Sequence, residues 1–448
     1  MISLATVVGV WTQSVTAVLI AATMSMLAAR RTALLLACVA VGLTGGWRSK
    51  IEWDAAVPRR TGPYAGWVTV VGDPGPFGTG LRVTMEIDGE RFDAWAYGSS
   101  RRRLVDRQAG QVVYAQGVRR SITSNARRAQ LRHVVGRFDL QVVGDWREGS
   151  RLSLTTSRVR VALRGAAERA MGVRDASLFT GLVIGDDARQ PVDMVLAFRT
   201  SGLSHLTAVS GENVAFIVAA ASPLLRRLRP WWRWAATLAL IGWFMALTRF
   251  EPSVLRAGVM AMLASSSYVL GRQTSVARVL ATAITILVLI DPMLVWSVGF
   301  WLSAGATAGV CLVAPPLAER VPGPAWLRVP LAVSLGAQLG VAVPSWLVFH
   351  RLPLMSLPAN LLAVPVAGFV MLFGIPAGLL AAAVPPLAPV LMAPCTAGTR
   401  WVAMVAYDGA ALEPSAEVGA VGWAMIVVAI GVLVVGHRWR RPPDDVPI

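Results

Sequence analysis

The sequence predicts a polytopic α-helical membrane protein with a small β-barrel domain inserted near its N-terminus. Two observations predict this fold class. The chain has 448 residues, of which 55% are hydrophobic and 15% are charged, and its mean hydropathy is +0.57. This composition is typical of multi-pass membrane proteins rather than of soluble domains. Residues 51–160 depart from it, because they alternate apolar and polar positions as β-strands do.

The charge balance indicates an anionic partner. The formal net charge is +17 despite the apolar composition, and nearly all the basic residues are arginine. Such a surface suits either nucleic acid or anionic lipid head groups.

Residues 1–50 are expected to form an N-terminal transmembrane hairpin. Two apolar segments, at roughly 8–28 and 32–47, are separated by Arg30 and Arg31. The first segment has no basic leader and no cleavage site before this arginine pair, so we expect a retained helix rather than a signal peptide.

Residues 51–160 are expected to form the β-domain, a compact antiparallel barrel. Stretches such as WVTVV, LRVTMEI and HVVGRFDLQVV are separated by turn-forming segments rich in Gly, Pro and Asp. Contiguous or paired arginines in this segment are candidates for nucleic-acid contact, and a solvated basic face explains them equally well. These candidates are Arg101, Arg102, Arg103, Arg119 and Arg120.

The remaining chain is expected to be mostly membrane-embedded. Residues 161–200 space arginines and apolar residues as an amphipathic helix on the membrane surface would. Residues 201–436 form the predicted transmembrane domain, and 437–448 a basic cytoplasmic tail. The candidate spans lie at roughly 203–224, 231–248, 253–270, 275–290, 294–315, 327–348, 354–373, 376–394 and 419–436.

Arginines in the short loops predict the orientation. If Arg30 and Arg31 are cytoplasmic, the N-terminus and the β-domain lie outside and the C-terminus lies inside. The later loop and tail arginines then all fall on the inside, namely Arg226, Arg227, Arg229, Arg272, Arg320, Arg438, Arg440 and Arg441.

Several polar groups interrupt the predicted spans and are candidates for a path through the membrane. A charged side chain at the centre of a span costs on the order of 2.5–3.5 kcal/mol on insertion scales, so such groups usually face an interior or an aqueous cavity. Prolines recur beside them, as in interrupted helices around a binding cavity. The candidates are His205, Ser210, Gly211, Glu212, Asn213, Arg256, Asp291, Ser303, His350 and Asn360.

Each candidate also has a simpler interpretation. His350 beside Arg351 fits a membrane surface, and Asp291 before a proline fits an ordinary helix start. Arg256 could extend to a lipid head group, pair with Glu212 or line a cavity. Ser210, His205 and Glu212 could instead form a hydrolase site, although no nucleophile elbow surrounds them. The sequence contains neither a P-loop nor metal-ligand spacing among its histidines and cysteines.

Five segments together resemble the ComEC family of competence proteins, and they occur in the order expected for that family. They are LFTGLVIGDDARQP (178–191), GLSHLTAVSGENVAFIV (202–218), EPSVLRAGVMAML (251–263), DPMLVWSVGFWLSAGA (291–306) and PSWLVFHRLPLMSLPANLLAVP (344–365). The resemblance implies that the membrane domain is a channel for uptake of single-stranded DNA across the cytoplasmic membrane. It also implies that the β-domain is an extracytoplasmic barrel of the OB type. Glu212 stands where the family commonly has a small or apolar residue.

The resemblance implies several partners. They are single-stranded DNA, membrane lipids, a cytoplasmic helicase-like motor, an extracytoplasmic DNA receptor and further copies of the chain. Trp67, Phe92, Trp95 and Tyr97 could stack on bases or fill the barrel core. No cofactor, metal or catalytic residue is expected, and the metallo-β-lactamase-like domain of many members has no counterpart here, so no nuclease activity is expected. The alternatives are a transporter of another anionic or lipid-linked substrate, and the membrane-embedded hydrolase.

Overall fold

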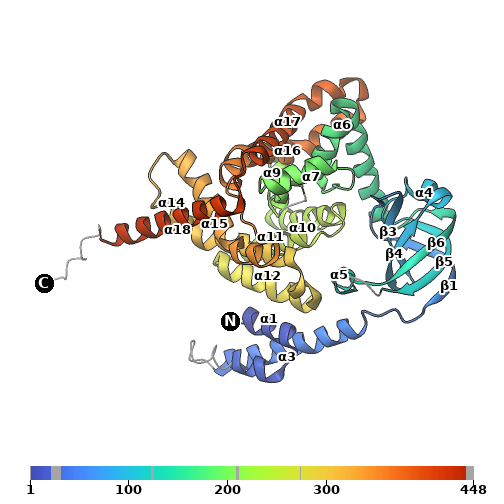
Figure 1. Cartoon of the computed structure of the whole chain (residues 1–448), viewed down its shortest axis with the longest axis horizontal. Helices are drawn as coiled ribbons and strands as arrows, with labels where there is room; N and C mark the ends of the chain where they lie inside the picture. Colours follow the sequence, from blue (N-terminus) through green and yellow to red (C-terminus); the bar gives the residue numbers. More distant parts are fainter. Residues whose placement is uncertain (1, 22–31, 123–125, 208–210, 273, 440–448) are drawn as a thin grey trace.

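The protein is described from a computed structural model that covers residues 2–21, 32–122, 126–207, 211–272 and 274–439. Over these residues the chain is mostly helical and has three parts. Figure 1 shows them as a blue N-terminal hairpin, a cyan β-domain and a larger helical domain coloured from green to red. The β-domain comprises residues 62–147, and the helical domain comprises residues 151–439.

The N-terminal hairpin contains α1 (Ile2–Thr12) and α3 (Thr32–Asp54). Their backbones come into direct contact, because a Cβ atom added to Gly9 would lie 2.2 Å from the carbonyl oxygen of Gly42. Helix α1 also contacts the helical domain, where the Ser3 hydroxyl donates to the carbonyl oxygen of Ala281 at 2.7 Å. Chain segments 278 positions apart are therefore joined.

The β-domain is a six-stranded sheet with two short helices. Its elements are β1 (Gly62–Val70), β2 (Gly75–Phe77), β3 (Gly80–Ile87), β4 (Glu90–Ala96), α4 (Gly98–Leu104), β5 (Val112–Ser121), α5 (Ala126–Gln130) and β6 (Val134–Arg147). Strand β1 pairs antiparallel with β5, and Thr69 and Val70 at its end also pair with β3. Because β3 pairs with β4, β4 with β6 and β6 with β5, each of these five strands has a neighbour on both sides. Large inward side chains such as Met85, Phe92 and Phe138 are fully buried between them.

The helical domain contains the rest of the described chain. Its elements are α6 (Arg151–Ile184), α7 (Val192–Thr200), α8 (Ser204–Thr207), α9 (Glu212–Leu225), α10 (Pro230–Leu247), α11 (Pro252–Val269), α12 (Val276–Ile290), the 3₁₀ helix η1 (Pro292–Trp296), α13 (Val298–Ala308), the π-helical turn η2 (Gly309–Val313), α14 (Ala314–Ala318), α15 (Ala325–Phe349), α16 (Ser356–Ala383), the 3₁₀ helix η3 (Pro385–Leu387), α17 (Ala388–Leu412) and α18 (Ala416–Trp439).

Helix α6 lies at the centre of the largest apolar core. Its second half is buried with residues of α16 and α17, and glycines allow the close approach. A Cβ atom added to Gly378 would lie 2.6 Å from the side chain of Leu163, and one added to Gly374 would lie 2.6 Å from Val183. Much of segment 161–200 is therefore interior to the helical domain, and its predicted position on a membrane surface stays a prediction.

Glycines also bring α13 and η2 against α15. A Cβ atom added to Gly309 would lie 1.9 Å from the carbonyl oxygen of Gly336, and one added to Gly340 would lie 2.1 Å from that of Gly305. Backbone contact of this kind is how helices pack where there is no large hydrophobic driving force, as in a bilayer.

Among the described helices, three are long and apolar enough to cross a membrane: Val298–Ala318, Ala325–Phe349 and Ser356–Ala383. A fourth candidate is the pair Pro385–Leu412 and Ala416–Val432, which is bent by 105°. The sequence predicted more and longer spans. Several of these are shorter helices, such as α9 with 14 residues and α12 with 15, whereas about 20 residues are needed to cross the hydrocarbon core.

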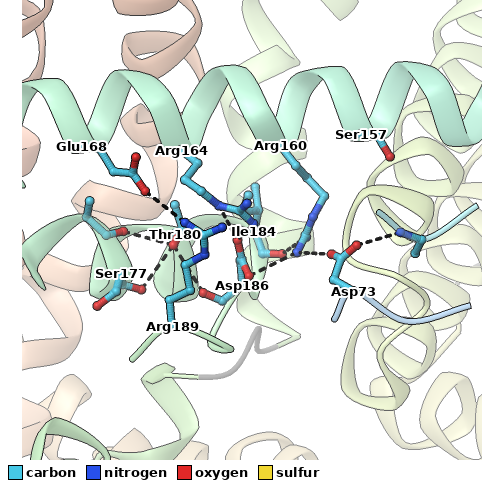
Figure 2. A network of polar contacts seen from close by, with 12 residues as sticks. Asp73, Ser157, Arg160, Arg164, Glu168, Ser177, Thr180, Ile184, Asp186 and Arg189 are labelled. Atoms are coloured by element: carbon cyan, nitrogen blue, oxygen red, sulfur yellow. Dashed lines mark hydrogen bonds and ion pairs between the residues drawn. The ribbon is translucent and has the colours of Figure 1, made fainter. Parts of the chain in front are cut away.

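A buried polar network joins the β-domain to the helical domain, as Figure 2 shows. The carboxylate of Asp73, in the loop after β1, lies 3.0 Å from Arg160 Nη2 and 3.1 Å from Arg249 Nη2. It also accepts a hydrogen bond from the backbone amide of Ala109 at 2.8 Å. Burial alone would raise the pKa of the Asp73 carboxyl, but the two guanidinium groups outweigh it, so this pKa lies below its usual value.

A second contact between the two domains involves the segment between α5 and β6. The ring of His133 is hydrogen-bonded to the carboxylate of Asp291 at 3.0 Å, and the guanidinium of Arg127 lies 4.8 Å from the ring centre of Trp296. Two separate polar contacts therefore fix how the β-domain sits on the helices.

Candidate functional site

A large cavity of about 2320 Å³ lies within the helical domain. Helices α7, α9, α10, α11, α13, α15, α16 and α18 contribute to its wall. Seven of the residues predicted from the sequence line it, namely His205, Gly211, Glu212, Arg256, Ser303, His350 and Asn360. These residues come from five separate stretches of the chain, and the fold brings them around one cavity.

The cavity extends along the whole length of two helices. Its lining includes the first and last residues of α9, Glu212 and Leu225, and those of α11, Pro252 and Val269. Helix α11 has 18 residues, so at 1.5 Å per residue it is about 27 Å long. This length is close to the roughly 30 Å thickness of a bilayer hydrocarbon core.

The two ends of the cavity differ in their surroundings. At one end lies Glu251, two positions after Arg249, which contacts the β-domain through Asp73. At the other end lie Arg226 and Arg233, near the point where the Trp234 indole donates to Ser266 at 3.1 Å. The cavity therefore runs from the side of the β-domain to the arginine-rich loop between α9 and α10.

In the stretch from His205 to Asn213 the described helical residues are Ser204–Thr207 of α8 and those of α9 from Glu212 on, and Gly211 just before α9 lies in a turn. Ser210, predicted on the path, lies outside the described residues. Asn213 is buried away from the cavity, because its side-chain amide donates to the carbonyl oxygen of Leu182 at 2.7 Å. It therefore ties α9 to α6 rather than facing the cavity.

Arg256 is 4% exposed and lies on the cavity wall. Its guanidinium donates to the hydroxyls of Thr307, at 2.7 Å, and of Ser303. The ion pairs between described residues do not include one between Arg256 and Glu212, so the pairing suggested by the sequence is not found. Of the three roles considered for Arg256, the cavity position is the one the structure places it in.

The remaining predicted path residues lie in different surroundings. Asp291 is not on the cavity wall: it accepts from the amide of Met293 at 3.0 Å, as a helix-start residue does, and binds His133. His350 ends α15 in the left-handed backbone region, with φ of 53°, and is exposed at the cavity. Asn360 is 7% exposed, and its Oδ1 has no hydrogen-bond partner in the described part of the chain.

The arginines predicted on the β-domain divide into two groups. Arg101, Arg102 and Arg103 lie on α4 and are exposed, and Arg120 is exposed beside Asp139 at 2.9 Å. Arg119 is buried and forms a 3.0 Å ion pair with Asp88, so it does not face an outside ligand. The strand directs this side chain to the inner face, which does not favour a contact with nucleic acid, and the predicted role of Arg119 stays a prediction.

The aromatic candidates divide in the same way. Phe92 is fully buried in the core, whereas Trp67 is 38% and Tyr97 is 52% exposed. Trp67 has the guanidinium of Arg147 only 4.0 Å from its ring centre.

Sequence reasoning missed some cavity residues. Glu413, between α17 and α18, lies on the wall and accepts from the amides of Leu354 and Met355 at 2.9 and 2.8 Å. It thereby holds the start of α16, which carries Asn360. Thr307, four residues after Ser303 on α13, was also missed, although this spacing places both hydroxyls on one helix face. Within the described residues no group of three His, Cys, Asp or Glu side chains could hold a metal ion.

The region that forms the cavity matches a known protein family. The model of the family described as "Competence protein" matches residues 182–443, which is more than half of the chain.

The chain belongs to the competence protein family.

Two curated proteins are similar to this competence-family chain. It is 30% identical over 213 residues to the uncharacterized protein YcaI of Escherichia coli, covering 43% of this chain and 28% of YcaI. It is 29% identical over 202 residues to ComE operon protein 3 of Bacillus subtilis, covering 44% of this chain and 26% of that relative. The match thus spans little more than a quarter of either relative. No solved structure matches the chain.

Proposed function

We propose that this competence-family protein forms a channel that passes single-stranded DNA across the cytoplasmic membrane during natural transformation. The observation that supports this most strongly is the cavity, whose lining reaches both ends of α9 and of α11. Helix α11, whose two ends both line the cavity, is about 27 Å long, close to the distance that a strand must travel through the hydrocarbon core. Family membership and the similarity to ComE operon protein 3 support a role in competence.

The β-domain would collect the strand on the outer side. Its pairing circuit, with β1 bonded to both β5 and β3 and with β4 parallel to β6, supports an OB-type barrel. Exposed Arg101, Arg102 and Arg103 offer phosphate contacts, and exposed Trp67 offers a stacking surface. The Asp73 network would hold this collecting surface beside the cavity end at Glu251.

The proposed orientation places the N-terminus and β-domain outside and the C-terminus in the cytoplasm. The arginine-rich loop after α9 then lies inside, as the distribution of loop charges favours. A cytoplasmic helicase-like motor would move the strand, an extracytoplasmic receptor would deliver it, and the channel would contact lipids and further copies of itself. In this proposal the chain itself is a conduit and not an enzyme.

A block placed inside the cavity tests the channel. Ser265 lines the cavity, whereas its neighbour Ala264 on α11 is exposed and does not line it. We expect Ser265→Trp to abolish import of labelled DNA into the cytoplasm and the matched Ala264→Trp to preserve it, both at wild-type amounts in the membrane. Normal import in Ser265→Trp cells would contradict the path. Normal import in cells that lack the gene would contradict the function itself.

A further inference from the structure

Two arginines of the helical domain are equally buried but differ in their counter-charges. Arg160 and Arg256 are each 4% exposed. Arg160 lies between two carboxylates, with Asp73 at 3.0 Å and Asp186 at 3.6 Å, and it also donates to two backbone carbonyls. Arg256 forms none of the ion pairs found among the described residues. A buried guanidinium with no carboxylate is unusual, because an uncompensated buried charge is strongly destabilising.

The contacts that Arg256 makes with described residues are all to neutral groups. Nη1 donates to Thr307 and lies 3.8 Å from the sulfur of Met260, Nη2 donates to Ser303, and Nε has no partner among the described atoms. The Thr307 hydroxyl donates a hydrogen bond to the carbonyl oxygen of Ser303 at 2.9 Å, which holds Thr307 in place on α13. A guanidinium has five N–H donors, so this one retains donors for a further acceptor.

The surroundings leave room for that acceptor. Arg256, Ser303 and Thr307 all line the cavity. Across from them Gly211 presents no side chain, and a Cβ atom there would lie 3.6 Å from Arg256 Nη2. The remaining guanidinium N–H groups and the Ser303 hydroxyl therefore form a cluster of donors on the cavity wall, and the Thr307 hydroxyl holds the guanidinium in place. Such a cluster matches the oxygens of a phosphate or phosphodiester group, which bind planar guanidinium donors well.

We propose that Arg256, Ser303 and Thr307 form an anion-binding site, and that its ligand is one phosphate group of a strand in the cavity. The missing counter-charge is then supplied by the ligand. That the phosphate belongs to a strand rests on the proposed channel function, whereas the binding of a phosphate group rests only on the geometry. The site would hold successive phosphates one at a time as the strand moves.

The purified full-length chain in lipid nanodiscs tests the site without any need for DNA transport. Thermal unfolding would be followed against increasing inorganic phosphate, and separately against a short oligothymidylate, at constant ionic strength. We expect both ligands to raise the unfolding midpoint of the wild type. Arg256→Gln and Ser303→Ala should weaken this apparent affinity by about tenfold to hundredfold, the usual effect of losing a hydrogen bond to a charged group. The matched Arg278→Gln, which removes one exposed positive charge from α12 away from the cavity, should not.

The unfolding midpoint measured without ligand shows whether Arg256 binds an anion or only supports the packing of the helices. If Arg256 were only a strut between α11 and α13, Arg256→Gln would lower the midpoint in phosphate-free buffer. If it is an anion site, Arg256→Gln should be at least as stable there as the wild type, since it removes an uncompensated charge. Arg256→Lys, which keeps the charge but loses the planar fork, gives a second variant in case the glutamine variant does not fold, and it too should bind phosphate more weakly.

The outcomes distinguish the two proposals. Wild-type phosphate and oligothymidylate binding in Arg256→Gln would overturn the anion site, even if deletion of the gene abolishes DNA import. Loss of phosphate binding in that variant would support the site, even if import proves independent of the gene. Binding of phosphate but not of oligothymidylate by the wild type would overturn the assignment to a strand.

Discussion

Asp73 of the β-domain and Arg160 of α6 form an ion pair of 3.0 Å that joins the β-domain to the helical domain. Arg160 is buried, with 5% of its side chain exposed, and Asp73 retains 18%. Removing one partner of a buried pair usually costs about 3–5 kcal/mol, because the other charge remains without compensation. Since Asp73 is partly exposed, we expect Asp73→Asn to cost about 3 kcal/mol, measured by unfolding of the full chain in detergent. The matched Asp193→Asn breaks a pair whose side chains are both 56% exposed and should change nothing measurable. Equal stability of the two variants would contradict the structural role of the network.

The contact between His133 and Asp291 should depend on pH. The hydrogen bond to Asp291 raises the pKa of the His133 imidazole, burial and Arg91 oppose this, and the charges of Asp291 and Glu52 reinforce it. A raised folded-state pKa means that the contact stabilises the domain arrangement fully below the unfolded value of about 6.5, and that this stabilisation is lost as the pH rises through the folded-state pKa. We therefore expect faster hydrogen exchange of residues 126–134 at about pH 8 than at about pH 6, after correction for the intrinsic rate. In His133→Gln the corrected rates should not change with pH, and a wild type without such a change would refute the prediction.

The glycine contact between η2 and α15 should be sensitive to a single methyl group. Gly309→Ala would place a Cβ atom 1.9 Å from the carbonyl oxygen of Gly336, so the helices must move apart. We expect a loss of about 1–3 kcal/mol in stability, as for other overpacked interiors, together with reduced DNA import. Gly431→Ala on α18 meets nothing within 4 Å and provides the control. A neutral Gly309→Ala would show that the two helices are not held at this distance in the membrane.

The exposed and the buried arginines of the β-domain should differ in their effect on the salt dependence of DNA binding. Replacing Arg101, Arg102 and Arg103 together by glutamine should weaken binding of single-stranded DNA by the full chain. It should also reduce the slope of log affinity against log salt by about 2, since each lost phosphate contact contributes about 0.7. Arg119→Gln should leave the slope unchanged and destabilise the β-domain, because this side chain is bound to Asp88. An unchanged slope in the triple variant would remove α4 from the proposed path.

The sequence identified much of the candidate site because ionisable groups in apolar segments are costly. His205, Glu212 and Arg256 all line the cavity, as expected from that cost. The helix-start role of Asp291 was among the interpretations that the sequence offered, but its contact with His133 and that of Asn213 with Leu182 could not be predicted, because these partners are remote in the sequence. Both residues were noticeable because a polar side chain in an apolar segment needs a hydrogen-bond partner. Only the tertiary structure shows which partner each of them has.

The inner face of β5 could not be assigned from the sequence alone. Positions 113, 115, 117 and 119 are buried, but Val112, Tyr114 and Val118 make the opposite face at least as apolar, so the two-residue period does not by itself assign Arg119 to the inner face. Helix lengths were also difficult to predict. Hydropathy marks where a chain is apolar, but it does not show that a helix such as α9 has only 14 residues. Helix α9 packs against α10, α11 and α16, and hydropathy does not report such contacts.

The contact of Ser3 with Ala281 has a consequence for how the protein is made. The two residues are 278 positions apart, and at a synthesis rate of roughly 5–20 residues per second the ribosome reaches the second about 14–56 s after the first. During this interval the face of α1 that will contact α12 is open to lipid or to the insertion machinery. Attachment of the hairpin is therefore a late step of biogenesis. Nascent chains arrested before and after α12 should differ in protease protection of residues 2–12, and equal protection would show that α1 is secured earlier by other means.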